Sequence, residues 1–310
     1  MPQLTIVILG AGAWGTTLAM VSRAHGHTVR VWSRQHAMQT YLDGADVVIS
    51  AVSMKGVSAV VELVQQEAIA AQTIFVTATK GLLWNTSVET MPLLPSQIWQ
   101  AAFPTHPVVV LSGPNLSQEI QQGLPAATVV ASDNLAAAET VQATLSSNSF
   151  RVYTNPDLLG VELGGTLKNV IAIAVGACDG LQLGTNAKAA LMTRGLAEII
   201  RVGTHWGAKP ETFYGLSGLG DLLATCNSAL SRNYQVGYGL AQGKPLAEVL
   251  AQLQGTAEGV NTTQVLMKLA QQQNIAVPIS HQVDRLLNGD ITPQAAVEAL
   301  MLRDYKPETR

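Results

Sequence analysis

Lys168 and Asn169 interrupt an apolar stretch, ELGGTLKNVIAIAVGACDG, at residues 162–180. We expect a helix over 157–177, in which residues four apart lie on one face. The face that contains the lysine combines small residues with this one cation: Gly164, Lys168, Ala172 and Gly176. A ligand or another backbone could approach such a face closely. The alternative is an ordinary helical lysine that extends its amine into solvent.

Lys168 has no obvious charge partner in the sequence, and a buried amine without a fixed anion has a lowered pKa. Such a lysine can act as an acid or base near neutral pH. A nicotinamide enzyme has a use for it, because the oxygen of a carbonyl substrate must gain a proton when hydride reaches the carbon. We therefore predict Lys168 as the catalytic residue, with Asn169 helping to hold the substrate.

The residues GAGAWG at 10–15 match the G-x-G-x-x-G pattern of dinucleotide-binding turns, between an apolar run and a helical pattern. Gly10 permits the tight turn, Gly12 lets the backbone approach a pyrophosphate, and Gly15 allows the helix to pack closely on the strand. The first amides of that helix would bind the phosphates. We predict a dinucleotide site here; the alternative is a glycine-rich turn without a ligand.

The end of the second expected strand, Val31-Trp32-Ser33-Arg34, indicates which dinucleotide is bound. NAD sites carry an acidic residue near this point for the ribose 2′-hydroxyl. This sequence instead offers Arg34, with Ser33 as a second donor, for a 2′-phosphate. We predict NADPH/NADP as the cofactor, with NADH accepted more weakly; the alternative is a solvent-exposed arginine.

Three other polar groups stand where a charged ligand could bind. Lys80 follows the expected strand TIFVT and so lies at the carboxyl edge of the sheet, where cofactors bind. Asp221 begins a helix after a glycine-rich segment, with Thr225 on the same face; taken alone, it is typical of an ordinary N-terminal helix charge. The segment SRN at 231–233 begins another helix, where an arginine and neighbouring donors can bind a phosphate; the alternative is a surface arginine.

The elements that would position these residues fall into two halves. Short β-like runs alternate with helical patterns at first, at residues 4–9, 28–32, 46–52, 73–77, 108–111, 127–131 and 150–153. This alternation predicts an α/β, Rossmann-like doubly wound parallel sheet. Afterwards the pattern is almost wholly helical, at residues 157–177, 187–206, 221–229, 246–254, 260–272, 280–288 and 293–302. We expect a dinucleotide-binding domain over 1–155 and an all-α substrate and catalytic domain over 156–310.

Composition narrows the function further. Only 13% of the 310 residues are charged, 47% are hydrophobic and the net charge is −3, so we expect no nucleic-acid partner. No uninterrupted apolar run reaches the ~18 residues of a membrane span, and we expect no signal peptide. Cys178 and Cys226 form no metal-ligand cluster, so we expect no metal and no disulfide. We predict a cytoplasmic protein, and its apolar surplus is compatible with a homodimer.

Together these motifs resemble those of the bacterial-type NAD(P)-dependent glycerol-3-phosphate dehydrogenases. The resemblance covers nearly the whole chain, in GAGAWG (10–15), TKG (79–81), SGPN (112–115), ELGGTLKNVIAIAVGACDG (162–180), GLSGLGDLLATC (215–226), SRN (231–233) and AEG (257–259). It implies reversible NAD(P)H-dependent reduction of dihydroxyacetone phosphate to sn-glycerol 3-phosphate, which supplies glycerophospholipid synthesis. It also implies Lys168 as the proton donor and acceptor.

The resemblance implies the other site residues as well. The substrate contacts would be Lys80, Gly113, Asn115, Lys168, Asn169, Asp221, Ser231, Arg232 and Asn233, with the arginine on the phosphate. The cofactor contacts would be Gly10, Gly12, Ala13, Trp14, Gly15, Arg34, Lys80, Ser117, Arg232 and Glu258. Asn115 departs from the family's usual threonine, and Ser117 stands at a position that is often alanine.

A larger departure lies between Arg34 and Ala45, which only ten residues separate. The family pattern has a far longer segment there, with a strand and a helix. We therefore expect this sheet to lack that strand and the adenine side of the cofactor site to be more open.

Two other functions fit part of the pattern. A β-hydroxyacid or ketopantoate-type NADP reductase also joins a Rossmann domain, a helical domain and a lysine, and Arg232 would then bind a carboxylate. A non-catalytic NADP-sensing module would need the glycine turn, but not Lys168, Asn169 and Arg232 together.

Overall fold

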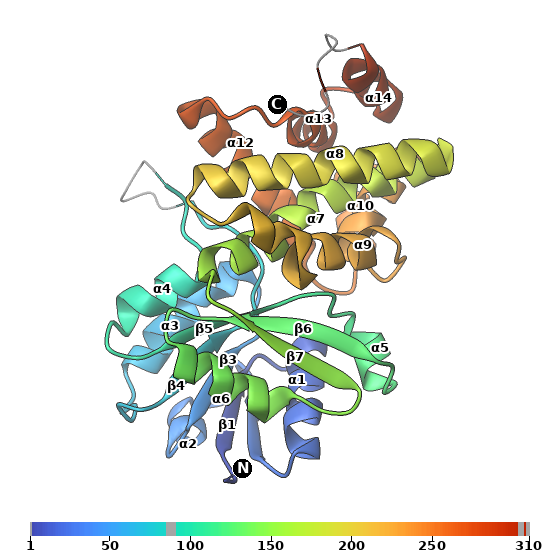
Figure 1. The fold of residues 1–310 in the computed structure, drawn as a ribbon. Coiled ribbons are helices and arrows are strands. Elements are labelled where there is room, and N and C mark those ends of the chain that lie inside the picture. The colour runs from blue at the N-terminus through green and yellow to red at the C-terminus, as the bar shows by residue number, and fades with distance from the viewer. Residues whose placement is uncertain (1, 85–90, 303–306, 308–310) are drawn as a thin grey trace.

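The computed structural model describes residues 2–84, 91–302 and 307. A seven-stranded sheet with the order β2-β1-β3-β4-β5-β6-β7 forms the N-terminal half, below the helices in Figure 1. Its strands are Thr5–Leu9 (β1), Thr28–Trp32 (β2), Val47–Ser50 (β3), Ile74–Thr77 (β4), Val108–Ser112 (β5), Ala126–Ala131 (β6) and Phe150–Asn155 (β7). Every predicted strand is present, and the Rossmann-like α/β half is confirmed.

The prediction of a wholly parallel sheet is wrong for one pair of strands. β6 runs antiparallel to β5, while the other neighbouring pairs are parallel. The connection between these two strands contains only the five-residue helix Ser117–Gln121 (α5), about 7.5 Å long at 1.5 Å per residue. So short a helix does not return the chain to the amino edge of β5. The eleven-residue helix Leu135–Leu145 (α6) makes such a return between β6 and β7, which are parallel.

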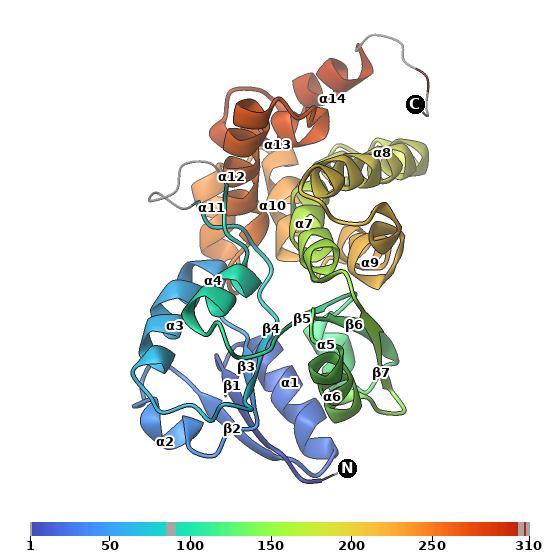
Figure 2. The same cartoon turned by 60° about the vertical axis from the view of Figure 1, so that its left-hand side comes forward.

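Helices cover both faces of the sheet (Figure 2). Helix α1 (Ala13–Ala24), α5 and α6 pack on one face, and the other face carries α2 (Gln39–Leu42), α3 (Val57–Gln65) and α4 (Pro95–Ala102). In β1, Ile6 and Ile8 face the first layer, whereas Val7 and Leu9 face the second, and all four are fully buried. A strand buried on both faces must be apolar throughout, which is why its sequence reveals it.

The short connection between β2 and β3 forms only the one-turn helix α2, so the predicted lack of a further strand there is confirmed. Arg30 fixes this connection, since its Nη1 donates to the carbonyl oxygens of Tyr41 and Asp43 at 2.9 and 2.6 Å. β2 is therefore left at the edge of the sheet.

The C-terminal half is built of helices around one central helix, Leu158–Gly180 (α7). The others are Gly184–His205 (α8), Asp221–Cys226 (α9), Arg232–Ala241 (α10), Leu246–Gln252 (α11), Glu258–Gln273 (α12), Pro278–Asn288 (α13) and Pro293–Met301 (α14). The predicted all-α half is thus confirmed. By length and hydropathy α7 could cross a membrane, but 83% of its most apolar window is buried inside the protein, as in a core helix.

The small-residue face of α7 receives other backbones. A Cβ atom added to Gly164 would lie 2.9 Å from the carbonyl oxygen of Ser217, and one added to Gly176 would lie 2.0 Å from that of Tyr234. Gly237 of α10 matches them, because its Cβ would lie 1.8 Å from the carbonyl oxygen of Ile173. The sequence allowed either a ligand or another backbone to approach this face. At both Gly164 and Gly176 the structure shows another backbone.

Apolar packing joins the halves. Val161, in the first turn of α7, shares an apolar cluster with Val110 of β5 and Ala131 of β6. The loop that follows β4 places Leu82 and Leu94 in the apolar core of the helical half, where both are fully buried. This loop begins at the end of β4 and so brings its first residues to the junction between the sheet and the helices.

Candidate active site

Two lysines and one aspartate meet at this junction from three separate segments. Lys168 Nζ lies 3.0 Å from Asp221 Oδ1, and Lys80 Nζ lies 2.5 Å from Oδ2 of the same carboxylate. Lys80 Nζ also donates to the carbonyl oxygen of Gly113 at 3.0 Å. The side chains of Lys168 and Asp221 are 7% and 3% exposed, and that of Lys80 is 20% exposed. The expectation that Lys168 has no fixed anion is therefore wrong: its partner is distant in the sequence.

The position of Asp221 depends on a π-helical turn, Leu216–Gly220 (η3), that sequence reasoning misses. This turn continues directly into α9, so Asp221 lies within a longer helical segment rather than at a free helix start. Gly218 makes the turn compact, because an added Cβ would lie 2.1 Å from the carbonyl oxygen of Phe213. The ordinary reading of Asp221 as an N-terminal helix charge is wrong, since its carboxylate binds the two lysines.

Burial sets the protonation of Lys168. Loss of solvent lowers the pKa of its amine from 10.5 to about 8, while the attraction of Asp221 opposes this shift and repulsion from Lys80 adds to it. Thr225 Oγ1 accepts a short hydrogen bond from Lys168 Nζ and donates to Asp221 Oδ1 at 3.2 Å. The amine is thus held on two sides and has a pKa at which proton exchange near neutrality is feasible.

A second polar group lies beside Lys168 on α7. Asn169 Oδ1 accepts a hydrogen bond from Asn233 Nδ2 at 2.9 Å, and Asn233 Oδ1 accepts one from the Gly259 amide at 2.9 Å. Ser231 caps α10 through its side-chain oxygen. Ser231 and the two asparagines are buried, whereas Arg232 is exposed at the first position of α10. The predicted residues at 231–233 therefore adjoin the predicted pair on α7.

The glycine turn fits a dinucleotide. Gly10 has φ +117, and a Cβ on Gly15 would lie 1.9 Å from the Gly10 carbonyl oxygen, so the fold itself requires both glycines. A Cβ on Gly12 would meet no atom within 4 Å, so this backbone borders open space at the N-cap of α1. Ala13 and Trp14 follow in the first turn of α1, whose free amides suit a pyrophosphate.

Arg34 lies in the turn after β2 and is exposed. The glycine turn is close by, because the Gly10 amide donates to the carbonyl oxygen of Trp32 at 3.0 Å. Ser33, the second donor expected here, has its hydroxyl 3.2 Å from His36 Nδ1. The structure thus places Arg34 at the same edge of the sheet as the glycine turn.

The loop after β5 holds three more of the predicted residues. Gly113 has φ +144, and a Cβ there would lie 3.0 Å from the Cα of Thr128. Asn115 Nδ2 donates to Thr128 Oγ1 at 3.1 Å, while Asn115 Oδ1 is buried without a hydrogen-bond partner among the described residues. Ser117 begins α5. Of the three, Gly113 lies in the lysine cluster, through its carbonyl bond to Lys80.

Glu258, the first residue of α12, reaches the sheet half from the helical half. Its Oε1 accepts a hydrogen bond from the Met54 amide, just after β3, at 3.1 Å. Burial raises the pKa of the Glu258 carboxyl, and the Met54 amide, Arg232 and Lys55 oppose that shift. The sequence places Thr225 on the same face as Asp221 but does not identify it as a site residue, whereas Glu258 is predicted from the family resemblance.

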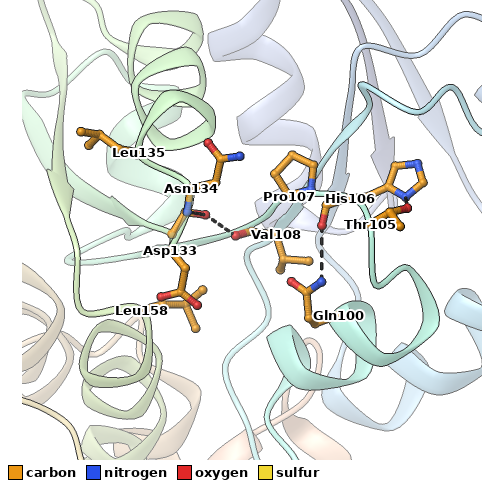
Figure 3. A pocket seen from close by; sticks show the side chains of 10 residues that line it. Gln100, Thr105, His106, Pro107, Val108, Asp133, Asn134, Leu135 and Leu158 are labelled. Carbon is orange, nitrogen blue, oxygen red and sulfur yellow. Dashed lines mark hydrogen bonds between the residues drawn. The ribbon is translucent and has the colours of Figure 1, made fainter.

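A cavity of about 540 Å³ lies apart from this cluster. Its walls come from α4, the start of β5 and the turn between β6 and α6, and Gln100, His106 and Asn134 are among the side chains in Figure 3. No predicted site residue lines it. The cavity adjoins Val108 at the start of β5, whereas the lysine cluster adjoins Gly113 at its end, so the two lie at opposite edges of the sheet.

A glycine turn on a Rossmann-like sheet, joined to a helical half that buries a lysine of lowered pKa, defines a dinucleotide-dependent oxidoreductase. Family models make the class specific. Residues 157–298 match the C-terminal region of NAD-dependent glycerol-3-phosphate dehydrogenase, and residues 5–42 and 35–138 match its N-terminal region. The chain belongs to this family, and the predicted family is confirmed.

Individual relatives agree. The chain is 66% identical over 310 residues to the glycerol-3-phosphate dehydrogenase (NAD(P)+) of Trichormus variabilis, covering 99% of each chain. It is 61% identical to that of Synechocystis, covering 98% of this chain and 95% of the relative. The crystal structure of the enzyme from Coxiella burnetii superimposes with a TM-score of 0.90 at 35% identity, covering 97% of this chain and 99% of the other.

The reductase considered as an alternative shares the architecture. A ketopantoate reductase from Ralstonia eutropha superimposes with a TM-score of 0.58 at 13% identity, covering 96% of this chain and all of the other. At that identity the likeness shows the fold alone. The assignment as an NAD(P)-dependent oxidoreductase of the glycerol-3-phosphate dehydrogenase family therefore stands on the higher identities.

Proposed function

We propose that this chain catalyses the reversible NAD(P)H-dependent reduction of dihydroxyacetone phosphate to sn-glycerol 3-phosphate, with Lys168 as the acid and base. The observation that carries this proposal is the buried amine of Lys168, held at 3.0 Å from Asp221 with a pKa of about 8. An amine of that kind is present partly as donor and partly as acceptor at neutral pH. The relatives named above carry the same activity in their names.

In the reduction, Lys168 donates a proton to the carbonyl oxygen of the substrate, and in the oxidation it takes the proton from the hydroxyl. Asp221 and Thr225 orient the amine, and the carboxylate charge stabilises its ammonium form. When bound, the nicotinamide dinucleotide supplies the hydride. Asn169, beside Lys168 on α7, holds the substrate next to the amine.

Arg232 is the residue we assign to the substrate phosphate. It is the exposed cation next to the buried Asn169–Asn233 pair, at the start of the ten-residue helix α10, whose amides add to its attraction for an anion. Gly255 leaves room for its side chain, because a Cβ there would lie 2.4 Å from Arg232 Nη1. Ser231, Asn233, Lys80, Gly113 and Asn115 complete the proposed substrate contacts.

For the cofactor, the glycine turn and the first turn of α1 bind the pyrophosphate, with Ala13 and Trp14 beside it. Arg34 binds the 2′-phosphate of NADP from the turn after β2, where its side chain is exposed. The remaining proposed contacts border the junction between the halves: Lys80, Ser117, Arg232 and Glu258.

Three broader proposals accompany the activity. The chain divides near residue 155, since β7 ends at Asn155 and α7 begins at Leu158. It acts in the cytoplasm and supplies glycerophospholipid synthesis; its free thiols Cys178 and Cys226 suit a reducing compartment.

The chain also forms a homodimer, and light scattering of the purified chain tests this. Helix α14, which buries no residue, is a candidate contact.

The test of the activity is the oxidation of NADPH with dihydroxyacetone phosphate, followed by absorbance, in wild type and Lys168→Ala. Parallel reactions use NADH and a 2-keto acid. We expect turnover with the phosphorylated ketone that collapses in the variant, while NADPH still binds with unchanged affinity. Equal turnover in the variant would remove Lys168 from the mechanism, and turnover with the 2-keto acid alone would favour the carboxylate reductases.

A further inference from the structure

The first turns of α12 contact two successive loops at the carboxyl edge of the sheet. Glu258 accepts a hydrogen bond from the Met54 amide in the loop after β3. Asn261, three residues further along α12, donates from Nδ2 to the carbonyl oxygen of Leu82 in the loop after β4, at 2.7 Å. Residues 258 and 261 lie on one face of the helix. This face therefore fixes both loops to the helical half.

The loop after β4 meets α12 at further points. Leu82 is fully buried in the apolar core of the helical half. Gly81, just before it, is enclosed: an added Cβ would lie 2.8 Å from Met54 Cβ and 3.4 Å from Glu258 Oε2. Later along α12, Lys268 Nζ lies 3.9 Å from the centre of the Trp84 ring. The first part of this loop, residues 81–84, is thus held against the helical half, largely by α12.

Lys80 stands two residues before the carbonyl that Asn261 holds. Two residues span at most about 7 Å of chain, so fixing Leu82 confines the Cα of Lys80. From there the Lys80 side chain must place Nζ 2.5 Å from Asp221 and 3.0 Å from the Gly113 carbonyl. Holding a lysine side chain in one conformation costs rotamer entropy. If the backbone at Lys80 is already fixed, no further backbone entropy is lost when the amine binds Asp221.

We infer that Asn261 is a positioning residue for Lys80: its amide, by holding the Leu82 carbonyl, sets where the Lys80 amine meets Asp221 and the substrate. This rests on the proposed function, in which Lys80 contacts the phosphorylated substrate. Asn261 itself touches neither substrate nor cofactor. Its effect on the reaction passes through the lysine.

The test compares Asn261→Asp, which places an acceptor against the Leu82 carbonyl, with Asn261→Ala and with Gln264→Ala, an exposed residue of the same helix. We expect the aspartate variant to raise the KM for dihydroxyacetone phosphate about tenfold. We expect the alanine variant to raise it less and the Gln264 variant not at all. Because Lys80 is also a proposed cofactor contact, we expect the KM for NADPH to rise in the two Asn261 variants as well, but less than the KM for the ketone. Equal increases in both KM values, or none, would overturn the inference.

A double-mutant cycle separates positioning from general weakening of the fold. In a Lys80→Ala background, Asn261→Asp should change the KM for the ketone by less than about twofold, because the residue it acts through is gone. Independent, additive effects would mean that Asn261 does not act through Lys80. If Asn261→Asp does not fold, the same cycle is run with Asn261→Ala.

A second readout does not depend on turnover. Labelling of lysines by an amine-reactive reagent, followed by peptide mass spectrometry, should show Lys80 labelled several-fold faster in Asn261→Asp than in wild type. Lys188, paired with Asp179 at a similar exposure, is the internal standard. Unchanged Lys80 labelling would overturn the inference. Absence of wild-type turnover with faster Lys80 labelling would instead reject the proposed substrate and leave the positioning role.

Discussion

Asp221 and Glu162 are equally buried, since each residue is 2% exposed. Their surroundings differ. Asp221 lies between two ammonium groups, at 3.0 and 2.5 Å. Glu162, six residues before Lys168 on α7, instead accepts hydrogen bonds from the Ser96 amide at 2.9 Å and from the Ser96 hydroxyl. Loss of solvent raises the pKa of Glu162 to about 7, against the opposing effect of the Ser96 bonds.

The difference teaches what a buried charge does in each region. The two lysines compensate the charge of Asp221, and the resulting cluster can move a proton. Glu162 takes the place of a capping side chain for α4, whose N-cap residue is Leu94 and has no side-chain acceptor. Its hydrogen bonds to Ser96 join the sheet half to the central helix. Its burial, without a cation beside it among the described residues, disfavours the ionised form of the carboxyl.

The largest expected effect on activity follows from removing the negative charge of Asp221. Asp221→Asn leaves the buried amine of Lys168 and the partly exposed amine of Lys80 without their anion, and we expect kcat/KM for the reduction to fall about 10²–10⁴-fold. Because Asp221 raises the pKa of Lys168, its loss lowers that pKa below about 8, so the reduction rate should decline with rising pH from a lower pH than in wild type. Steady-state kinetics between pH 6 and 9 measure both changes, and a profile identical to wild type would contradict this account.

Glu162, which has no neighbouring cation in the described part of the chain, should instead affect how the free energy of unfolding depends on pH. Because its pKa is raised from 4.5 to about 7 on folding, Glu162 binds its proton more tightly in the native state. The free energy of unfolding should therefore fall as pH rises through that window, by up to about 1.4 kcal/mol per pH unit from this group. Glu162→Gln should abolish this contribution, and urea unfolding at several pH values measures it.

The matched control for that experiment is Glu139→Gln, an exposed carboxylate on α6. It should leave the pH dependence of the unfolding free energy as in wild type. An equal change in both variants would mean that burial at the junction is not the cause.

A smaller effect is expected from the hydroxyl that links the cluster. Thr225→Val removes the acceptor for Lys168 and the donor to Asp221 while nearly preserving the shape of the side chain. One such hydrogen bond contributes about 1 kcal/mol, so kcat should fall about fivefold with little change in the KM for NADPH. Thr225→Ser, which keeps the hydroxyl, should recover most of the activity; failure to do so would point to lost packing.

The smallest effect is expected at a partly exposed ion pair that lies outside the lysine cluster. Asp179 Oδ2 lies 2.6 Å from Lys188 Nζ, with the two side chains 25% and 20% exposed. Asp179→Asn should change the unfolding free energy by about 1 kcal/mol or less and leave kcat/KM unchanged. A loss of activity approaching that of Asp221→Asn would show that the comparison between buried and exposed pairs does not hold in this protein.

Much of the fold can be predicted from the sequence, because burial on two faces makes strands such as β1 and β3 almost wholly apolar. The antiparallel direction of β6 cannot, since it depends on how far the short helix α5 carries the chain. The η3 turn is also hidden, because its glycines are equally typical of an irregular loop.

The sequence by itself determined the glycine turn, the lysine on an apolar helix and the two kinds of half, since these follow from local backbone requirements and from the period of the apolar residues. Only the tertiary structure decided which anion Lys168 meets. That depends on η3 approaching α7 at Gly164, which brings Asp221 to the lysine. Such contacts join residues far apart in the chain, and no local pattern records the distance between them.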